Sequence, residues 1–306
     1  MRLLKIAEAE SNQRLDKFLA KYMNKAPKSF VYKMLRKKNI KLNGGKAQGN
    51  EVLKSGDEIS LYLAEETIDS FCEKKQVAVY EEKPDIIYED SNLIIVNKPV
   101  GLLSQSEKKG DKNLNDMLLY YLSRTGEYDT SEHGVFKPGI VSRLDRNTSG
   151  ITLMGKNLAA QQQLSFAFKE HTVKKLYLAV CEGTIEKEGR VELNQKKLKG
   201  NKVVAGSGGN KAITLYKPLK QDNNCTVVQV ELVTGKTHQI RVAFSSIGHP
   251  LLGDVKYGGK KVGGMNSQAL HAYSLTFNFK SGTLAYLDGK TFVAEPKGKI
   301  AKLVDL

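Results

Sequence analysis

One short stretch of the sequence places a carboxylate in a turn between two apolar runs. Asp145 stands between Leu144 and Arg146, two residues beyond Arg143, and residues 147–150 then read Asn, Thr, Ser and Gly. Those four residues favour a turn, because short polar side chains bond their own backbone and glycine accepts positive φ. Residues 151–154 predict a short buried strand after it. A carboxylate where a strand meets a loop is well placed for chemistry, although it can also serve only to organise its turn.

The tripeptide around this carboxylate does not predict a site by itself. Arg-Leu-Asp occurs at residues 143–145 and again at residues 14–16. The second copy belongs to a predicted amphipathic helix, where a catalytic role is not expected. The longer string around Asp145 therefore carries the functional interpretation.

Charge is the strongest signal in the composition. The chain of 306 residues has a formal net charge of +15. Such an excess favours polyanionic partners, chiefly nucleic acid, although it can also serve solubility alone. Residues 1–63 contain 14 Lys and Arg against 6 Asp and Glu, whereas residues 64–90 contain 3 basic and 9 acidic residues. A basic module joined by an acidic connector to a larger body fits this distribution.

Several classes of protein are excluded by what the sequence lacks. Its apolar runs are shorter than a membrane span and the N-terminus has no signal-peptide core, so we expect a cytoplasmic protein that does not enter a membrane. The three Cys residues are scattered and the five His residues show no metal-ligand spacing, so we expect neither disulfides nor a metal.

Two phosphate-binding motifs are matched only in part. Residues 235–237 resemble the end of a P-loop, but Val230 stands where that motif requires glycine. Residues 206–209 begin like a dinucleotide fingerprint, yet its third glycine position is Lys211. We therefore expect no nucleotide hydrolysis, no hydride transfer and no small-molecule cofactor.

The N-terminal region predicts a small unit of two helices and a sheet. Apolar residues recur at helical spacing in residues 14–23 and 29–38. Residues 40–46 read as a strand entering an Asn-Gly hairpin turn, and residues 57–63 alternate like a half-buried strand. Residues 64–84 show no clear periodicity and predict a solvated linker.

The remaining chain predicts a larger α+β domain. Two strands flank a turn near residues 90–92, and Asn113 and Asn157 can cap helices that extend to about residues 122 and 170. Further strands are expected at residues 175–181, 226–232 and 270–279. A helix over residues 237–247 would project Arg241 from its first turns. Residues 124–138 are expected to form an irregular loop near the cleft, and residues 195–211 a mobile basic hairpin or loop. The pattern favours a mixed, mostly antiparallel sheet with flanking helices.

The chain resembles the RluA-type pseudouridine synthases. Four motifs occur in the order of that family, within about residues 85 to 280: residues 87–102, 139–154, 175–180, and 232–242 with 249–254 and 257–259. One departure is Ser142, where the family usually has His before the Arg-Leu-Asp. Serine at this position can alter how the loop packs and which RNA is chosen. Asp145 itself is present.

The resemblance implies roles for individual residues. Asp145 would be the catalytic aspartate, acting on the sugar, on the base, or as the base that removes a ribose proton. Arg241 would pair with it and Tyr177 would stack on the uracil and move a proton; without the resemblance these are a surface Arg and a core Tyr. Arg143 would help fill the space left by the extruded base. Lys98 and Pro99 would shape the cleft floor, whereas His238 and His271 are expected to be structural.

The N-terminal unit resembles the alpha-L (S-four-type) RNA-binding motif. That resemblance implies that five basic residues face RNA phosphates: Lys33, Arg36, Lys37, Lys38 and Lys41. A solvated basic helix face is the alternative. We therefore expect an RNA-binding domain at residues 1–64, an acidic linker at 65–84 and a catalytic domain at 85–306.

These observations predict an RNA pseudouridine synthase that acts on uridines of RNA, with ribosomal RNA favoured over transfer RNA. The rival hypothesis is a non-catalytic RNA-binding or ribosome-associated protein that retains the fold, suggested by Ser142. The sequence leaves the oligomeric state open, with a monomer as the simpler expectation.

Overall fold

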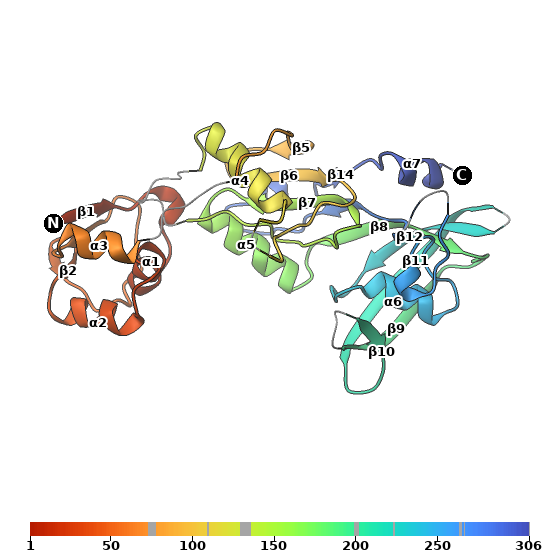
Figure 1. Cartoon of the computed structure of the whole chain (residues 1–306), viewed down its shortest axis with the longest axis horizontal. Coiled ribbons are helices and arrows are strands. Elements are labelled where there is room, and N and C mark those ends of the chain that lie inside the picture. The colour runs from red at the N-terminus through yellow and green to blue at the C-terminus, as the bar shows by residue number, and fades with distance from the viewer. Residues whose placement is uncertain are drawn as a thin grey trace.

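The structure is a computed structural model that describes residues 1–72, 78–108, 110–128, 136–198, 202–222, 224–262, 265 and 267–305. Figure 1 shows a small N-terminal unit at one end of an elongated molecule and a long sheet with helices through the rest. None of the helices in the described part of the chain has both the length and the apolar composition that a bilayer crossing requires.

The N-terminal unit contains a four-stranded sheet and three helices. The strands are β1 (Arg2–Lys5), β2 (Ile40–Leu42), β3 (Gly45–Lys46) and β4 (Glu58–Leu61), in the order β1-β4-β2-β3. The helices are α1 (Leu15–Tyr22), α2 (Lys28–Arg36) and α3 (Glu65–Phe71). The apolar stripes of α1 and α2 pack against β2 and β4 in one core, which confirms both predicted helices. Asn43 and Gly44 have positive φ between β2 and β3, the turn that an Asn-Gly pair favours.

Helix α3 corrects one expectation from the sequence. Residues 64–84 were expected to lack regular structure, but α3 occupies the first part of that segment and buries Ile68 in the N-terminal core. Arg2 of β1 donates hydrogen bonds to Glu65 at 2.9 Å and to Asp69 at 2.6 Å. One buried apolar residue in a short acidic helix gives too little periodicity to detect. Residues 73–77 of the expected linker lie outside the described residues.

The larger sheet spans the rest of the molecule. Its strands are β5 (Ile86–Glu89), β6 (Leu93–Lys98), β7 (Ser149–Gly155), β8 (Lys174–Glu182), β9 (Gly189–Lys197), β10 (Val203–Ala205), β11 (Asn210–Asp222), β12 (Cys225–Leu232), β13 (Leu270–Thr276) and β14 (Thr291–Val293). The order is β10-β9-β11-β12-β8-β13-β7-β6-β5, and β14 pairs with β13. In the described residues, the pairs are antiparallel except for β7 with β13. The predicted mixed, mostly antiparallel α+β architecture is confirmed.

Helices cover both faces of the sheet near its β5 edge. Helix α4 (Leu114–Arg124) and helix α5 (Leu158–Lys169) lie on opposite sides of the sheet in Figure 1. Strand β6 shows why: Ile94 and Val96 belong to the core beneath α4, while Leu93 and Ile95 belong to the core beneath α5. This alternation is the period of two that a strand buried on both faces requires.

Helices α4, α5 and α6 (Gln239–Ser246) were predicted from their capping residues or helical spacing, whereas α7 (Lys299–Val304) was not predicted. The side chains of Asn113 and Asn157 accept the backbone N–H groups of Asp116 and Ala160 at the starts of α4 and α5. Helix α6 buries Phe244 and carries Arg241. The shorter helix α7 lies near the C-terminus.

Two expected loops are only partly described. Much of residues 195–211 is paired: Val203 of β10 lies opposite Lys197 of β9, and Asn210 of β11 lies opposite Gln195. These are hairpins built from polar and glycine-rich sequence, which gives a weak strand pattern. Residues 129–135 and 199–201 lie outside the described residues.

Candidate active site

The turn that carries Asp145 is fixed by backbone hydrogen bonds on both sides of it. The Thr148 N–H donates to the carbonyl of Asp145 at 3.0 Å, which closes the predicted turn. Ser104 Oγ donates to the carbonyl of Leu144 at 2.8 Å and accepts its N–H at 3.0 Å. The loop enters β7 at Ser149, so the strand and these bonds together set where the carboxylate lies.

The side chain of Lys98 forms hydrogen bonds to the backbone of two segments, one of which is the turn that carries Asp145. Its side chain is fully buried at the end of β6, and Nζ donates to the carbonyls of Pro99, Leu102 and Arg146 at 2.9, 2.7 and 3.0 Å. Burial lowers the pKa of Lys98 to about 7, against the opposing effect of the Asp145 charge. Lys98 therefore shapes the floor of the site, as expected from the sequence.

The structure brings Asp145 and Arg241 together. Arg241 Nη1 lies 3.1 Å from Asp145 Oδ2, and the Asp145 side chain remains 30% exposed. On its other edge Arg241 donates two hydrogen bonds to Asp254, Nε to Oδ2 at 2.6 Å and Nη2 to Oδ1 at 2.8 Å. Burial acts to lower the pKa of Arg241, but the paired carboxylates, Asp254 foremost, raise it above its ordinary value. The guanidinium is therefore a fixed cation in contact with the Asp145 carboxyl group.

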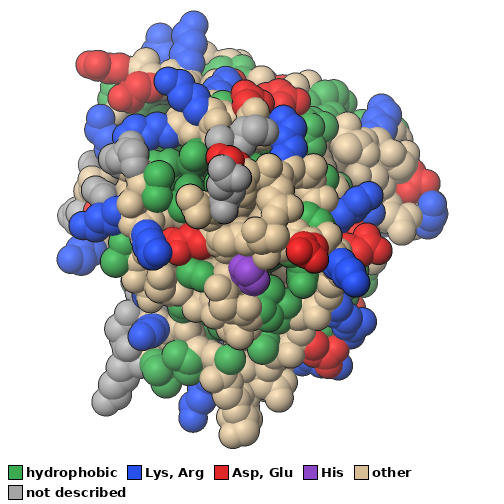
Figure 2. Space-filling model, turned by 90° about the vertical axis from the view of Figure 1, so that its right-hand side faces the viewer, with side chains coloured by type: hydrophobic (Ala, Val, Ile, Leu, Met, Phe, Trp, Pro, Cys, Tyr) green, Lys and Arg blue, Asp and Glu red, His purple; other side chains and the backbone are tan. Residues whose placement is uncertain are grey.

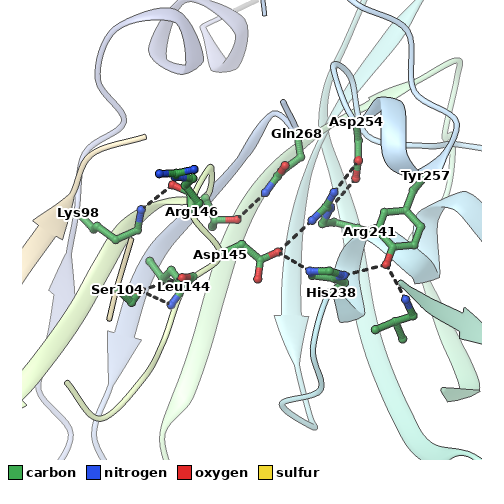
Figure 3. A network of polar contacts seen from close by, with 12 residues as sticks. Lys98, Ser104, Leu144, Asp145, Arg146, His238, Arg241, Asp254, Tyr257 and Gln268 are labelled. Atoms are coloured by element: carbon green, nitrogen blue, oxygen red, sulfur yellow. Dashed lines mark hydrogen bonds and ion pairs between the residues drawn. The ribbon is translucent and has the colours of Figure 1, made fainter. Parts of the chain in front are cut away.

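His238 and Tyr257 complete the cluster, as Figure 3 shows. Tyr257 lies in a 3-10 helix (Val255–Tyr257), and its ring centre lies 4.8 Å from the Arg241 guanidinium carbon. His238 Nδ1 is 2.8 Å from the Tyr257 hydroxyl, and His238 Nε2 is 3.6 Å from Asp145 Oδ2. The sequence predicts a structural role for His238; its contact with Tyr257 is compatible with that role, and its other ring nitrogen faces the carboxylate. His238 precedes α6 in a left-handed backbone conformation, so its spacing from Arg241 gives no signal of this arrangement.

Tyr177 lies on strand β8, which is separated from β7 by β13. It pairs in register with Val230 and Ala272 and packs, half-buried, against two adjoining cores, the one beneath α5 and the one that contains Phe244 of α6. Burial, together with the Asp145 charge, raises the pKa of Tyr177 above its ordinary value. The phenol of Tyr177 therefore keeps its proton at neutral pH, and it lies close enough to Asp145 for that charge to affect its pKa.

The other residues singled out near Asp145 differ in exposure. Arg143 and Arg146 are exposed on the rim of the turn. Ser142 lies against β7, where Thr152 Oγ1 donates to its carbonyl at 2.6 Å. His271 is fully buried between Ser149 Oγ at 2.8 Å and the carbonyl of Ala294 at 2.7 Å, which agrees with the structural role expected for it.

Four of the five basic N-terminal residues singled out in the sequence are exposed. Lys33, Arg36, Lys37 and Lys38 are exposed at the end of α2. Lys41 is half-buried, with Nζ 5.0 Å from the centre of the Tyr62 ring. By contrast, Figure 2 shows Lys and Arg dispersed among acidic side chains on the opposite end of the molecule.

This geometry provides a partly exposed carboxylate, a fixed cation and a protonated phenol. Such a carboxylate can act as a nucleophile or as a base without redox chemistry. Among the described residues, no cluster of three or more His, Cys, Asp or Glu could hold a metal ion.

Comparisons with known proteins identify both parts of the chain. Residues 92–246 match the RNA pseudouridylate synthase family and residues 13–59 match the S4 domain. The chain is 33% identical over 277 residues to the uncharacterized RNA pseudouridine synthase YlyB of Bacillus subtilis, covering 89% of this chain and 88% of that one. It is 36% identical over 265 residues to ribosomal large subunit pseudouridine synthase C of Rickettsia felis, covering 82% and 83%.

Solved structures share the fold. Human RNA pseudouridylate synthase domain containing 4 is 21% identical with a TM-score of 0.57, covering 71% of this chain and 90% of that one. Human RNA pseudouridylate synthase domain containing 1 is 24% identical with a TM-score of 0.53, covering 74% and 96%. The family match, the extent of the curated relatives and the fold agree. The chain belongs to the RNA pseudouridine synthases, isomerases that act on RNA.

Proposed function

We propose that this enzyme converts specific uridines of large-subunit ribosomal RNA to pseudouridine, with Asp145 as its catalytic carboxylate. The observation that carries the proposal is the ion pair of Asp145 with Arg241, whose other edge is clamped by the buried Asp254. It holds the Asp145 carboxyl group beside a cation and leaves it 30% exposed, open to substrate.

The reaction matches what the cluster offers. The glycosidic bond of uridine breaks, the uracil turns, and its carbon 5 bonds to the ribose, so atoms are only rearranged. Asp145 attacks the sugar, attacks the base or removes a ribose proton; in each case it acts as a carboxylate, beside the cation of Arg241.

Two further residues take roles around the extruded base. The target uridine must leave its stack to reach a carboxylate that lies within the fold. Tyr177 is proposed to stack on the uracil and to move a proton, since its phenol stays protonated beside Asp145. Arg143, exposed on the rim, is proposed to fill the space that the base vacates.

The choice of RNA is supported by the N-terminal domain and by the relatives. The S4 match and the basic surface formed by Lys33, Arg36, Lys37, Lys38 and Lys41 favour phosphate contacts. Several relatives are named for the large ribosomal subunit. We therefore assign RNA binding to the unit that ends with α3 and chemistry to the chain from residue 78 onward, which moves α3 out of the expected linker.

Replacing Asp145 with Asn tests the proposal. The change removes a charge with almost no change in volume, so the variant should fold and lose turnover. Tritium release from carbon 5 of labelled uridine in RNA measures the reaction, with Asp288→Asn at an exposed ion pair as the matched control. Wild-type turnover by the Asp145 variant would refute the assignment.

A second measurement tests the substrate. Pseudouridine is mapped in all stable RNAs from cells with and without the protein. We expect pseudouridine sites to be lost from large-subunit ribosomal RNA. If sites are lost only from transfer RNA, transfer RNA is the substrate and the proposed chemistry is unchanged. No lost site, with the purified protein also inert, would favour the non-catalytic alternative.

A further inference from the structure

A chain of hydrogen bonds leads from the backbone of β10 to the carboxylate of Asp145. The Val203 N–H donates to the Tyr257 hydroxyl at 3.1 Å, and that hydroxyl lies 2.8 Å from His238 Nδ1. On the far side of the ring, His238 Nε2 faces Asp145 Oδ2 at 3.6 Å. Figure 3 shows this row running beside Arg241 into the site.

These hydrogen bonds determine which nitrogen of the His238 ring carries the proton. The Tyr257 oxygen already accepts the Val203 N–H. Burial raises the pKa of Tyr257, so the hydroxyl keeps its proton and needs an acceptor for it. His238 Nδ1 is the acceptor that lies within reach among the described residues. The neutral imidazole therefore carries its proton on Nε2, the nitrogen that faces Asp145.

The charges around His238 favour the neutral ring. Burial lowers the pKa of His238, and the cations of Arg241 and Lys256 act in the same direction. Asp145 and Asp254 act in the opposite direction without reversing the shift. At neutral pH the ring is thus an uncharged donor, and Arg241 remains the cation of the pair.

Both contacts of the Asp145 carboxylate with the described residues fall on the same oxygen. Arg241 Nη1 lies 3.1 Å from Oδ2 and His238 Nε2 approaches the same atom. We infer that His238 is a positioning residue which, with Arg241, holds Oδ2 and so presents the other oxygen, Oδ1, to the substrate. This inference rests on the proposed role of Asp145.

The 3.6 Å separation is longer than a hydrogen bond. Catalytic hydrogen bonds are often long before substrate binds and shorten in the reacting complex. The contact between His238 and Asp145 therefore stabilises the transition state more than the bound substrate. Its removal should lower turnover while leaving the KM for RNA nearly unchanged.

The backbone at His238 allows a well-matched set of variants. Its φ is +55°, a left-handed conformation that Asn adopts readily. His238→Asn therefore keeps the backbone but is too short to reach Asp145. His238→Gln can place an amide N–H where Nε2 lies and cannot titrate. Tyr257→Phe keeps the ring against Arg241 and removes only the hydroxyl that orients His238.

The experiment measures kcat and KM by tritium release from pH 5.5 to 8.5, with thermal melts to check folding. The controls are Asp145→Asn and His249→Gln, since His249 bonds the carbonyl of Glu182 on another part of the sheet. We expect His238→Asn to lower kcat about tenfold to a hundredfold, as when one hydrogen bond to a charged group is removed. His238→Gln should recover most of that decrease. Because an amide does not titrate, this variant should also lack any change in kcat that protonation of His238 produces below its ordinary pKa of 6.5.

The outcomes separate this inference from the proposed function. An active Asp145→Asn enzyme would refute the proposed function itself. If Asp145→Asn is inactive but a folded His238→Asn has the same kcat as His249→Gln, the inference alone is refuted. A change in His238→Asn that is confined to KM would also refute it. If His238→Asn does not fold, Tyr257→Phe decides: a fall in kcat supports the inference and wild-type kcat overturns it.

Discussion

At the scale of single residues, Arg241 contacts two carboxylates that differ sharply in their access to solvent. The Asp254 side chain is 1% exposed, whereas the Asp145 side chain is 30% exposed. The buried partner fixes the guanidinium through two parallel hydrogen bonds, and the other partner stays partly open to solvent. One edge of the cation is thus an anchor, and the other is the edge to which we assign the chemistry.

Replacing Asp254 with Asn tests that division. It removes one charge of a buried pair, so the free energy of unfolding should fall by about 3 to 5 kcal/mol. Turnover should fall too, because Arg241 is no longer held against Asp145. Urea denaturation measures the first effect and tritium release the second. Asp288→Asn, in the exposed pair with Lys280, should change stability by less than about 1 kcal/mol. Equal effects of the two substitutions would show that Asp254 is no anchor.

The sequence could single out Asp145, Arg241 and Tyr177 as candidates because each lies in a motif whose order along the chain is visible, and the structure places Asp145 against Arg241. It could not assign roles to Asp254 and His238. Asp254 acts by meeting Arg241 from a position just before a separate short helix, and His238 acts through the angle that its left-handed backbone gives the ring. Both depend on tertiary contacts that spacing alone does not encode.

At the scale of elements, Gly150 decides how β7 meets β13. Its φ is +110°, and a Cβ built on it would lie 2.2 Å from the Ala272 carbonyl oxygen. The two strands pair in parallel through Ser149 with His271 and Gly150 with Ala272. The glycine noted in the sequence as a turn former is therefore required for close backbone contact within the sheet.

Gly150→Ala should consequently be costly. Backbone strain and overpacking together should lower the free energy of unfolding by about 2 to 5 kcal/mol. The control is Gly248→Ala, where φ is +81° and a Cβ would meet nothing within 4 Å. The control carries the strain without the clash, so thermal or urea unfolding should show the smaller decrease there. Identical decreases would mean that the contact with Ala272 is unimportant.

Element prediction succeeded where patterns were long and failed where they were short. Capped helices such as α4 and α5 have apolar residues over three turns, and their starts are marked by Asn113 and Asn157. Helix α3 has one buried residue, so its acidic composition dominated the interpretation. The hairpins of β9, β10 and β11 were obscured by Gly and Lys in the same way.

At the scale of the whole molecule, exposed basic residues follow one another at the end of α2 in the N-terminal unit. The exposed residues of α2 and its C-terminal turn form a basic surface, while the opposite end mixes both signs (Figure 2). Affinity for RNA and chemistry on RNA should therefore be separable.

A truncated protein beginning at residue 78 tests this separation. It keeps Tyr80, whose hydroxyl accepts the Asn113 N–H at 2.9 Å, and it removes the N-terminal core with α3. It should bind RNA more weakly, with the salt dependence of log K shallower by about 0.7 to 0.9 for each phosphate that the truncated protein no longer binds. The full-length chain with Lys33, Arg36, Lys37 and Lys38 changed to Gln should show a similar decrease. Unchanged slopes in both would exclude the basic surface from RNA binding.

The position of β13 in the sheet has a consequence for the timing of activity. This strand is formed by residues 270–276, yet it lies between β7 and β8 in the middle of the sheet. Asp145 precedes β7 and Arg241 follows β12, so a nascent chain contains both side chains before it contains the strand that joins their two halves of the sheet. A growing chain that has not reached residue 270 therefore lacks the strand that places the carboxylate against its cation. The site is completed only after the side chains that form it have been made.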